Sequence, residues 1–290
     1  MGKVYEALSR AQDEGCEFDL FDELEEEQED PAEQVPVPEK FHFMRYSLGV
    51  SSVVDRDRTK QNSAAALVRR TSPPGRELTI NPRRIDPHLV SFYNSDPRAS
   101  DQYNRLALTL ISRSAERGFK RVLVASAGRG DGRTCVTLNL ACALARARQR
   151  VLVVDCDFSN PSVMRALGMD CDLGLVESFE RGIPPGTAMV KISPYGFNVL
   201  PTCRPVPNPA ELLAAAGLWK MLQSFDADHD FLLFDSTALL NAVDSSLLVR
   251  FTGNTLLVVR AGATSSSDLA AAIAPFSQDD ILGVVINRAP

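Results

Sequence analysis

The fold is decided by the stretch RVLVASAGRGDGRT, residues 121–134, in which an apolar run leads into a glycine-rich segment. The run RVLVAS has the composition of a buried strand, and the residues after the glycines suit a helix. A strand, a glycine-rich turn and a helix in this order form a P-loop, whose usual pattern is G-x-x-x-x-G-K-[ST]. Here Ala127 and Gly132 take the glycine positions, Arg133 the lysine position and Thr134 the hydroxyl position. The stretch therefore predicts a phosphate-binding loop with arginine in place of lysine.

More apolar runs of strand length follow this loop, and helical stretches separate them. Near-continuous apolar strands that alternate with helices are typical of a parallel sheet covered on both faces. We therefore predict an α/β fold of the three-layer, P-loop NTPase-like type, with a mostly parallel sheet and helices on both faces. The predicted strands are residues 121–126, 151–155, 197–201, 231–235, 255–260 and 282–287, and the predicted helix after the loop is 134–148.

Composition divides the 290 residues into three predicted regions: a short N-terminal helix (1–12), an acidic and Pro/Ser-rich linker that is mostly disordered (13–84), and the α/β domain (85–290). Residues 13–33 hold twelve acidic residues and no Lys or Arg, which is typical of a solvated strip. The hydrophobic content of 44% is enough for a core, and it excludes a collagen or a wholly disordered chain.

Several functions are disfavoured by what the sequence lacks. No apolar run reaches the length of a membrane helix, so we expect no direct membrane span. Basic residues are dispersed without an aromatic–basic stripe, so we expect no nucleic acid partner. The six cysteines form no C-x-x-C pair and sit mostly in apolar segments. That pattern indicates reduced thiols in a cytoplasmic protein, and neither a zinc site nor a disulfide framework.

The glycine-rich loop supplies the predicted cofactor site. Its three glycines allow backbone N–H groups to turn inward around phosphates, and the helix that follows adds its positive N-terminal end. The hydroxyl of Thr134 is a suitable Mg²⁺ ligand. We expect ATP or ADP with Mg²⁺ as cofactors, held by the following loop residues: Gly128, Arg129, Gly130, Asp131, Gly132, Arg133, Thr134 and Cys135.

Three acids end predicted strands downstream of this loop. Asp155 and Asp157 close VLVVDCD, and because they lie two apart, both point from the same side of an extended chain. Asp235 closes FLLFD, where a carboxylate that supports Mg²⁺ belongs. We predict Thr134, Asp155 and Asp235 as the metal site. We predict Asp155, Asp157 and Arg133 as the catalytic residues, with one of the two aspartates accepting a hydroxyl proton.

The chain from about residue 85 resembles the cytoplasmic domain of bacterial tyrosine kinases, a family of deviant P-loop ATPases that regulate capsule and exopolysaccharide production. GDGRT matches the family's G-E-G-K-[ST], VLVVDCDFSNP its second aspartate motif, and FLLFDSTAL its Walker B strand. NVLPTCRPVPNPAELL, residues 198–213, matches its L-P-x-G-x-x-x-P-N-P-x-E-L-L loop. Asn287 falls where related ATPases contact the base, which the resemblance assigns to cofactor binding.

The chain departs from the family at several points. Arg133 replaces the lysine, and Asp101, Asn104 and Ala107 stand where the family carries the E-x-x-R-x-x-R helix tied to ring assembly. The five tyrosines are scattered, without the C-terminal cluster on which these kinases phosphorylate themselves.

The resemblance implies an ATP-binding, tyrosine-kinase-like cytoplasmic protein that regulates exopolysaccharide or capsule biosynthesis or export. The arginine in the P-loop leads us to expect weakened catalysis. The implied partner is a membrane polysaccharide co-polymerase or chain-length protein, which would place the chain peripherally at the inner membrane, and a homo-oligomer is a further expectation. Two alternatives stay open: a non-catalytic scaffold or regulatory pseudokinase, and a partitioning-type ATPase.

Overall fold

The computed structural model describes residues 76–93, 96–241, 245–274 and 276–287. The chain divides into two units, residues 1–70 and 71–290, and only the second contains described residues. The predicted helix at 1–12, the acidic strip at 13–33 and the predicted linker up to residue 75 therefore lie outside the described residues.

The described residues form one sheet with the strand order β1-β4-β5-β3-β6-β2-β7-β8. All neighbouring strands in it run parallel except β4 and β5, which are antiparallel. The prediction of a mostly parallel sheet is confirmed. The strands are β1 (Arg76–Thr79), β2 (Arg121–Ser126), β3 (Val151–Asp155), β4 (Val190–Ser193), β5 (Phe197–Leu200), β6 (Phe231–Asp235), β7 (Thr255–Arg260) and β8 (Ile281–Asn287).

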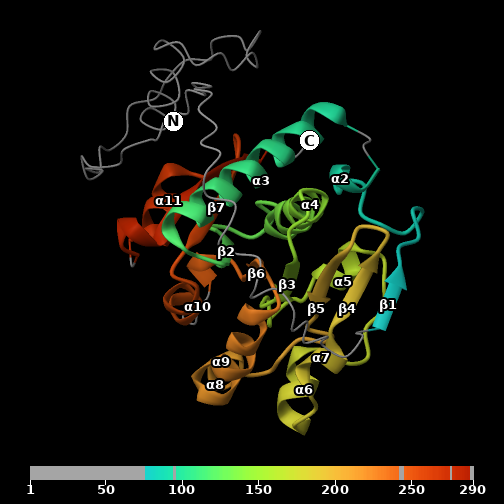
Figure 1. Ribbon diagram of the computed structural model, residues 1–290. Helices are drawn as coiled ribbons and strands as arrows, with labels where there is room; N and C mark the ends of the chain where they lie inside the picture. Colours follow the sequence, from blue (N-terminus) through green and yellow to red (C-terminus); the bar gives the residue numbers. More distant parts are fainter. Residues whose placement is uncertain (1–75, 94–95, 242–244, 275, 288–290) are drawn as a thin grey trace, which may run out of the picture. The chain divides into compact units, whose positions relative to one another are not determined.

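Helices cover both faces of this sheet, as predicted (Figure 1). One core unites α2, α3, α4 and α5 with one face, and a second unites α6, α8, α9, α10 and α11 with the other. The helices are α2 (Val90–Tyr93), α3 (Pro97–Arg117), α4 (Arg133–Arg146), α5 (Val163–Ala166), α6 (Leu175–Arg181), α7 (Pro185–Ala188), α8 (Pro209–Ala214), α9 (Ala216–Gln223), α10 (Ser245–Thr252) and α11 (Ser266–Ile273), with 3₁₀ turns η1 (Ser224–Ala227), η2 (Leu239–Asn241) and η3 (Gln278–Asp280).

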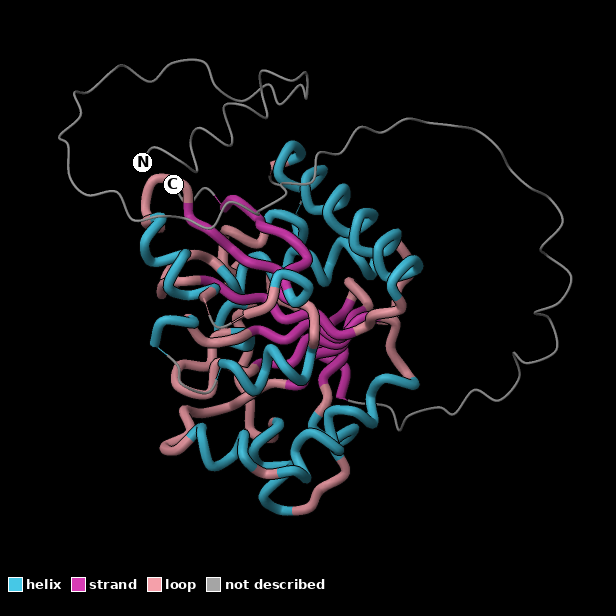
Figure 2. Tube along the Cα trace, turned by 90° about the vertical axis from the view of Figure 1, so that its left-hand side faces the viewer, coloured by secondary structure: helices cyan, strands magenta, loops and turns pink. Residues whose placement is uncertain are grey.

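The central strands are those with the longest apolar runs. Every residue of β3 and β6 is buried, because helices pack on both of their faces. In the second view the strands run between helices on their two sides (Figure 2). This three-layer arrangement brings the carboxyl ends of the parallel strands to one edge of the sheet.

The sheet contains two strands, β1 and β4, that the apolar runs did not predict. The strand β1 lies ahead of the predicted domain start at residue 85 and pairs with β4 at the edge of the sheet. The helix α3 begins where Asp96 accepts a hydrogen bond from the Ala99 amide, with Pro97 at the first turn, and it ends at Gly118 in the left-handed conformation.

The prediction of a full set of reduced thiols is wrong for one pair. Cys171 and Cys203 form a disulfide, with their Cα atoms 5.2 Å apart. The two residues are separated by 32 positions and meet because the loop after α5 folds against the loop after β5. Local spacing carries no sign of this tertiary contact. Among the described residues, Cys135, Cys142 and Cys156 are free thiols.

Candidate functional site

The predicted site residues gather at the carboxyl edge of the sheet. β6 lies between β2 and β3, so that Asp235 is opposite Asp155 in one pair and opposite Val124 in the other. The loop that joins β2 to α4 runs across these strand ends. The structure therefore brings the glycine-rich loop together with the strand-end acids, of which Asp235 lies 101 residues beyond Thr134 in the sequence.

Two glycines of the loop have conformations that other residues rarely adopt. Gly130 has φ of 88° and Gly132 has φ of 93°. A Cβ atom on Gly132 would lie 2.1 Å from Nδ2 of Asn287. That amide donates a hydrogen bond to the Asp131 carbonyl at 2.9 Å. Asn287, at the end of β8, therefore packs directly against the loop's main chain.

The loop is braced from a second side by Asp131. One carboxylate oxygen of Asp131 accepts from the Gly128 amide at 2.9 Å, and the other accepts from Oγ1 of Thr264 at 2.9 Å. Thr264 lies between β7 and α11, and its hydroxyl also accepts from the Arg260 amide. The β7–α11 connection thus sets the position of the glycine loop.

The hydroxyl of Thr134 lies against the acid of the neighbouring strand. Thr134 Oγ1 donates to Asp235 Oδ2 at 2.7 Å, and it lies 2.7 Å from Oγ of Ser162. The other oxygen of Asp235 accepts from Thr137 Oγ1 at 3.3 Å. Asp235 is fully buried. Its carboxylate accepts hydrogen bonds from two hydroxyls of α4, those of Thr134 and Thr137.

Asp155 is held by main-chain amides. Its two oxygens accept from the amides of Asp157, Ser162 and Val163 at 3.1–3.2 Å. Burial raises its pKa well above the usual value, and the nearby charge of Asp235 raises it further, although these amides oppose the shift. Burial likewise raises the pKa of Asp235 to about 6, against the hydrogen bond from Thr134.

Asp157 lies closer to solvent and beside two arginines. Burial raises its pKa, whereas the Asn160 amide and the charges of Arg133 and Arg129 lower it. Its carboxylate lies 3.7 Å from the guanidinium of Arg133. Arg129 is exposed on the loop, so its cation faces the open side of the site.

The guanidinium of Arg133 points into the protein beneath the loop. Its Nε donates to the Ser236 carbonyl at 2.9 Å, and its Nη1 donates to the Gly128 carbonyl at 2.8 Å and to the Ser126 hydroxyl. The side chain is only 7% exposed. The planar fork of arginine reaches these three acceptors from two nitrogens, Nε and Nη1, whereas a lysine would present all of its donors from a single nitrogen on a differently shaped side chain. Arg133 thus ties the P-loop to the end of β6.

The remaining predicted contact is Cys135. Its thiol packs against the core under α4, and burial raises its pKa to about 12. The thiol therefore stays protonated, and only the main-chain amide of this residue is placed to meet a phosphate.

The donor set fits Mg²⁺ bound together with a nucleotide. Thr134, Asp155 and Asp235 offer hydroxyl and carboxylate oxygens, which are the ligands that Mg²⁺ prefers. Burial raises the pKa of both Asp155 and Asp235, and a bound cation would lower it. Among the described residues no group of three or more His, Cys, Asp or Glu side chains is arranged to hold a metal ion. Mg²⁺ usually takes one or two carboxylates from a protein, with phosphates and waters completing its shell.

Several residues of the site escaped sequence reasoning. Ser162, Thr202 and Thr264 contact Thr134, Asp155 and Asp131, respectively, from three separate loops. They are small hydroxyl residues without a motif, and only the folded sheet brings them to the site.

This strand–loop–helix geometry defines a P-loop nucleotide-binding protein. The family model of the CobQ/CobB/MinD/ParA nucleotide binding domain matches residues 122–290, more than half of the chain. The chain therefore belongs to this family.

Relatives within this family are bacterial tyrosine kinases. The tyrosine-protein kinase YwqD of Bacillus subtilis is 25% identical over 206 residues, which make up 70% of this chain and 87% of YwqD. The tyrosine-protein kinase Wzc of Salmonella typhi is 26% identical over 158 residues, 54% of this chain and 22% of Wzc. The chain thus spans most of one relative and less than a quarter of the other.

Solved structures agree on the fold. The kinase domain of the Escherichia coli tyrosine kinase ETK superposes with a TM-score of 0.65 at 22% identity, covering 71% of this chain and 81% of that domain. MinD from Pyrococcus horikoshii, solved with Mg-ADP, superposes with a TM-score of 0.50 at 21% identity, covering 58% and 70%. In the described part of the chain, no helix combines the length and the apolar character that crossing a membrane requires.

Proposed function

We propose that this chain binds ATP or ADP with Mg²⁺ and acts as a tyrosine-kinase-like regulator of exopolysaccharide or capsule production, with phosphoryl transfer weakened by Arg133. The observation that carries the proposal is the hydrogen bond of 2.7 Å from Thr134 to Asp235 beneath the glycine loop. It joins the two groups that a P-loop site uses to hold Mg²⁺. The bacterial tyrosine kinases among the relatives support the choice of reaction.

The proposal gives each group a role. Amides of residues 128–135 and the exposed Arg129 meet the phosphates, and Asn287 lies where it can contact the base. Thr134, with Asp155 and Asp235, holds Mg²⁺, which neutralises phosphate charge when it is bound. Asp157, the more exposed of the two β3 acids, accepts the proton of an attacking hydroxyl.

Arg133 is the reason for weakened transfer. Phosphoryl transfer depends almost entirely on positioning and on charge placed at the transferred group. The guanidinium is committed to carbonyls of the loop and of Ser236, so it offers its charge to a γ-phosphate only after three hydrogen bonds are broken. Binding through the loop amides does not need that movement.

The proposed organisation follows the predicted regions, with an N-terminal helix (1–12) and a linker from residue 13, but the nucleotide domain begins before residue 85 because β1 belongs to its sheet. We propose that the partner is a membrane polysaccharide co-polymerase, and that the chain forms a homo-oligomer. The matched segment makes up only 22% of Wzc, so most of Wzc lies outside the match.

A non-catalytic regulator is the second candidate, and the inward position of Arg133 favours it. In that case the chain would retain nucleotide without transferring phosphate. A partitioning-type ATPase is less well supported, since positions 127–129 read Ala, Gly and Arg and lack the additional lysine of that group.

One assay separates these candidates. The full chain is incubated with γ-labelled ATP and Mg²⁺, with and without a tyrosine-containing copolymer, and phosphotyrosine, free phosphate and nucleotide retained by the protein are all measured. The proposal expects slow transfer to tyrosine. Phosphate release without phosphotyrosine supports the ATPase, and bound nucleotide without either product supports the non-catalytic regulator. A chain that binds no nucleotide contradicts all three.

A further inference from the structure

The disulfide between Cys171 and Cys203 joins two loops beside the nucleotide site. Cys171 lies between α5 and α6, and Cys203 lies between β5 and α8. Both residues are partly exposed. Cys142 and Cys156, by contrast, are buried. Cys135 is partly exposed as well, but it is a free thiol, so among the described residues Cys171–Cys203 is the bond that a reductant in solution can act on.

From Cys203 the chain leads at once to a site residue. The preceding residue, Thr202, is buried and donates from Oγ1 to the Asp155 carbonyl at 2.7 Å. Further along the same loop, the Val206 amide donates to the Phe158 carbonyl at 2.8 Å. The loop that carries Cys203 therefore clamps both ends of the segment that holds Asp155 and Asp157.

The chain on the Cys171 side leads to the same acid. The helix α5 precedes this loop, and the amides of Ser162 and Val163 at its start donate to Asp155 Oδ2 at 3.2 and 3.1 Å. After the cysteine, the Leu175 amide donates to the Pro201 carbonyl at 2.7 Å. The disulfide thus links the loop that follows the amides holding the Asp155 carboxylate to the loop whose Thr202 holds the Asp155 carbonyl.

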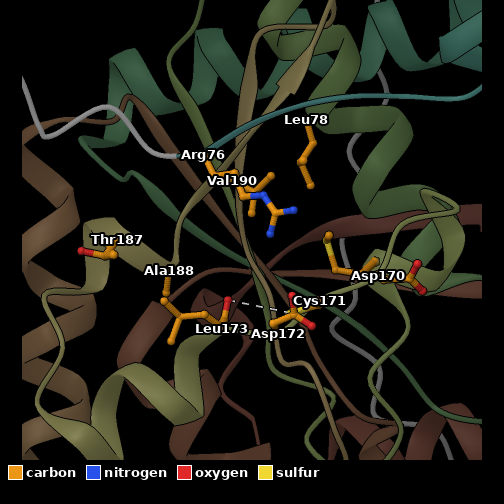
Figure 3. A pocket seen from close by; sticks show the side chains of 10 residues that line it. Arg76, Leu78, Asp170, Cys171, Asp172, Leu173, Thr187, Ala188 and Val190 are labelled. Carbon is orange, nitrogen blue, oxygen red and sulfur yellow. Dashed lines mark hydrogen bonds between the residues drawn. The ribbon is translucent and has the colours of Figure 1, made fainter.

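Cys171 borders a small cavity. It lines a pocket of about 110 Å³ together with Asp170, Asp172 and the edge strands β1 and β4. Figure 3 shows Cys171 between these two aspartates, with the Arg76 side chain extending from β1 into the same space. This pocket is the side from which we expect a small thiol to approach the bond.

We propose that Cys171–Cys203 is a thiol–disulfide exchange site through which a dithiol reductant lowers the affinity of the Mg-nucleotide site. A thiolate of the reductant attacks the Cys171 sulfur, the bond to Cys203 breaks, and Cys203 leaves as a thiolate that takes up a proton. The second thiol of the reductant then attacks the mixed disulfide. This step releases Cys171 as a thiol and leaves the reductant as a disulfide, so that two electrons have passed to the protein.

Reduction would lower the affinity for Mg-nucleotide because it removes the covalent link between the two loops. With the bond open, the two loops fluctuate separately, and binding must order the groups that hold Asp155. The proposal rests on the proposed binding of Mg-nucleotide at this site. It adds a reactive group that regulates that binding.

The test compares the full chain before and after treatment with dithiothreitol. Peptide mapping without reductant is expected to find Cys171 linked to Cys203. Titration with Mg-ADP is expected to show an affinity about fivefold lower after reduction. A Cys171→Ser/Cys203→Ser variant should bind as the reduced chain does and ignore dithiothreitol. The matched Cys142→Ser variant, which changes a buried thiol away from the disulfide, should keep the response.

Other results overturn the proposal. Free thiols at Cys171 and Cys203 in the untreated chain would show that the disulfide does not form. Equal affinities for Mg-ADP before and after reduction would show that the disulfide does not affect binding. In both cases the proposed nucleotide binding is unaffected. If neither form binds nucleotide, the proposed function fails. The inference, which rests on that binding, fails with it. Where nucleotide does bind, hydrogen exchange of residues 155–163 checks the cause: faster exchange after reduction supports the inference, and unchanged exchange overturns it.

Discussion

The two halves of the nucleotide site are built in different ways. The half proposed to hold the metal consists of Thr134 and the strand-end acids, whose carboxylates accept hydrogen bonds from hydroxyls and amides. The phosphate half is the glycine loop, in which Arg133 turns inward and bonds to the loop's own carbonyls. The carboxylates of Asp155 and Asp235 lie side by side at the strand ends. The guanidinium of Arg133, by contrast, forms hydrogen bonds within the protein.

Under the proposed function, nucleotide binding and phosphoryl transfer depend on different groups of this site. Binding would use the loop amides and Mg²⁺, and neither needs the Arg133 side chain to move. Transfer would need a cation at the γ-phosphate, whereas the guanidinium of Arg133 bonds to protein carbonyls. Variants that change one half alone test whether the two activities separate.

The largest effect is expected for Arg133→Lys. Lysine reaches phosphate oxygens as a point charge, so transfer from ATP should rise on the order of 100-fold. The same change removes hydrogen bonds to Ser236 and Gly128, so the free energy of unfolding should fall by about 1–3 kcal/mol. Phosphotyrosine assays and urea unfolding check both. Faster transfer at unchanged stability would show that Arg133 does not brace the loop.

The metal half is tested by Asp235→Asn. The amide cannot supply the negative charge that supports Mg²⁺, so the Mg-dependent affinity for ADP should fall about 10- to 100-fold. Calorimetric titration measures it, with Asp101→Asn on the exposed face of α3 as the control that changes the same charge elsewhere. An unaltered affinity in the Asp235 variant would place the metal away from these strand ends.

The pH dependence of stability is the third test. The pKa of Asp235 rises from the usual 3.8 to about 6 on folding, so the folded chain retains a proton that the unfolded chain loses. Without Mg²⁺, this contribution is complete below about pH 3.8 and is lost as the pH rises through about 6. Urea unfolding at pH 4.5 and 7 should show the decline, and Asp235→Asn should flatten it. An equal slope in the variant would assign the effect to other groups.

The smallest effect is expected for Thr264→Val. This change removes the hydroxyl that holds Asp131 while keeping side-chain volume, and one hydrogen bond is worth about 0.5–1.5 kcal/mol. The affinity for ADP should fall about threefold, as titration can show. Ser267→Ala, in the first turn of α11, should bind as the natural chain does. Equal behaviour of the two variants would mean that the β7–α11 connection does not position the loop.

Sequence reasoning reached the elements whose pattern is local. Continuous apolar runs identified the strands that carry Ser126, Asp155 and Asp235, and the glycines identified the loop, because strand burial and positive φ angles leave direct marks on composition. Parallel topology then required these strand ends to meet at one edge.

The features that the sequence did not predict depend on tertiary contacts. The inward turn of Arg133 is set by a carbonyl after β6, and the disulfide by two loops that meet only in the folded chain. The edge strand β1 is short and mostly exposed, so it carries no apolar run to mark it. A role for Arg133 at the phosphates was assigned by position in the motif, and it stays a prediction.

Magnesium-dependent titration of ADP and ATP into the full natural chain, beside the Arg133→Lys variant, tests the central claim most directly. The account predicts that both proteins bind nucleotide only with Mg²⁺, and that their affinities agree within about tenfold, one charge-assisted hydrogen bond being the difference. Binding by the lysine variant alone would contradict it, because the arginine would then have removed the nucleotide site together with its chemistry.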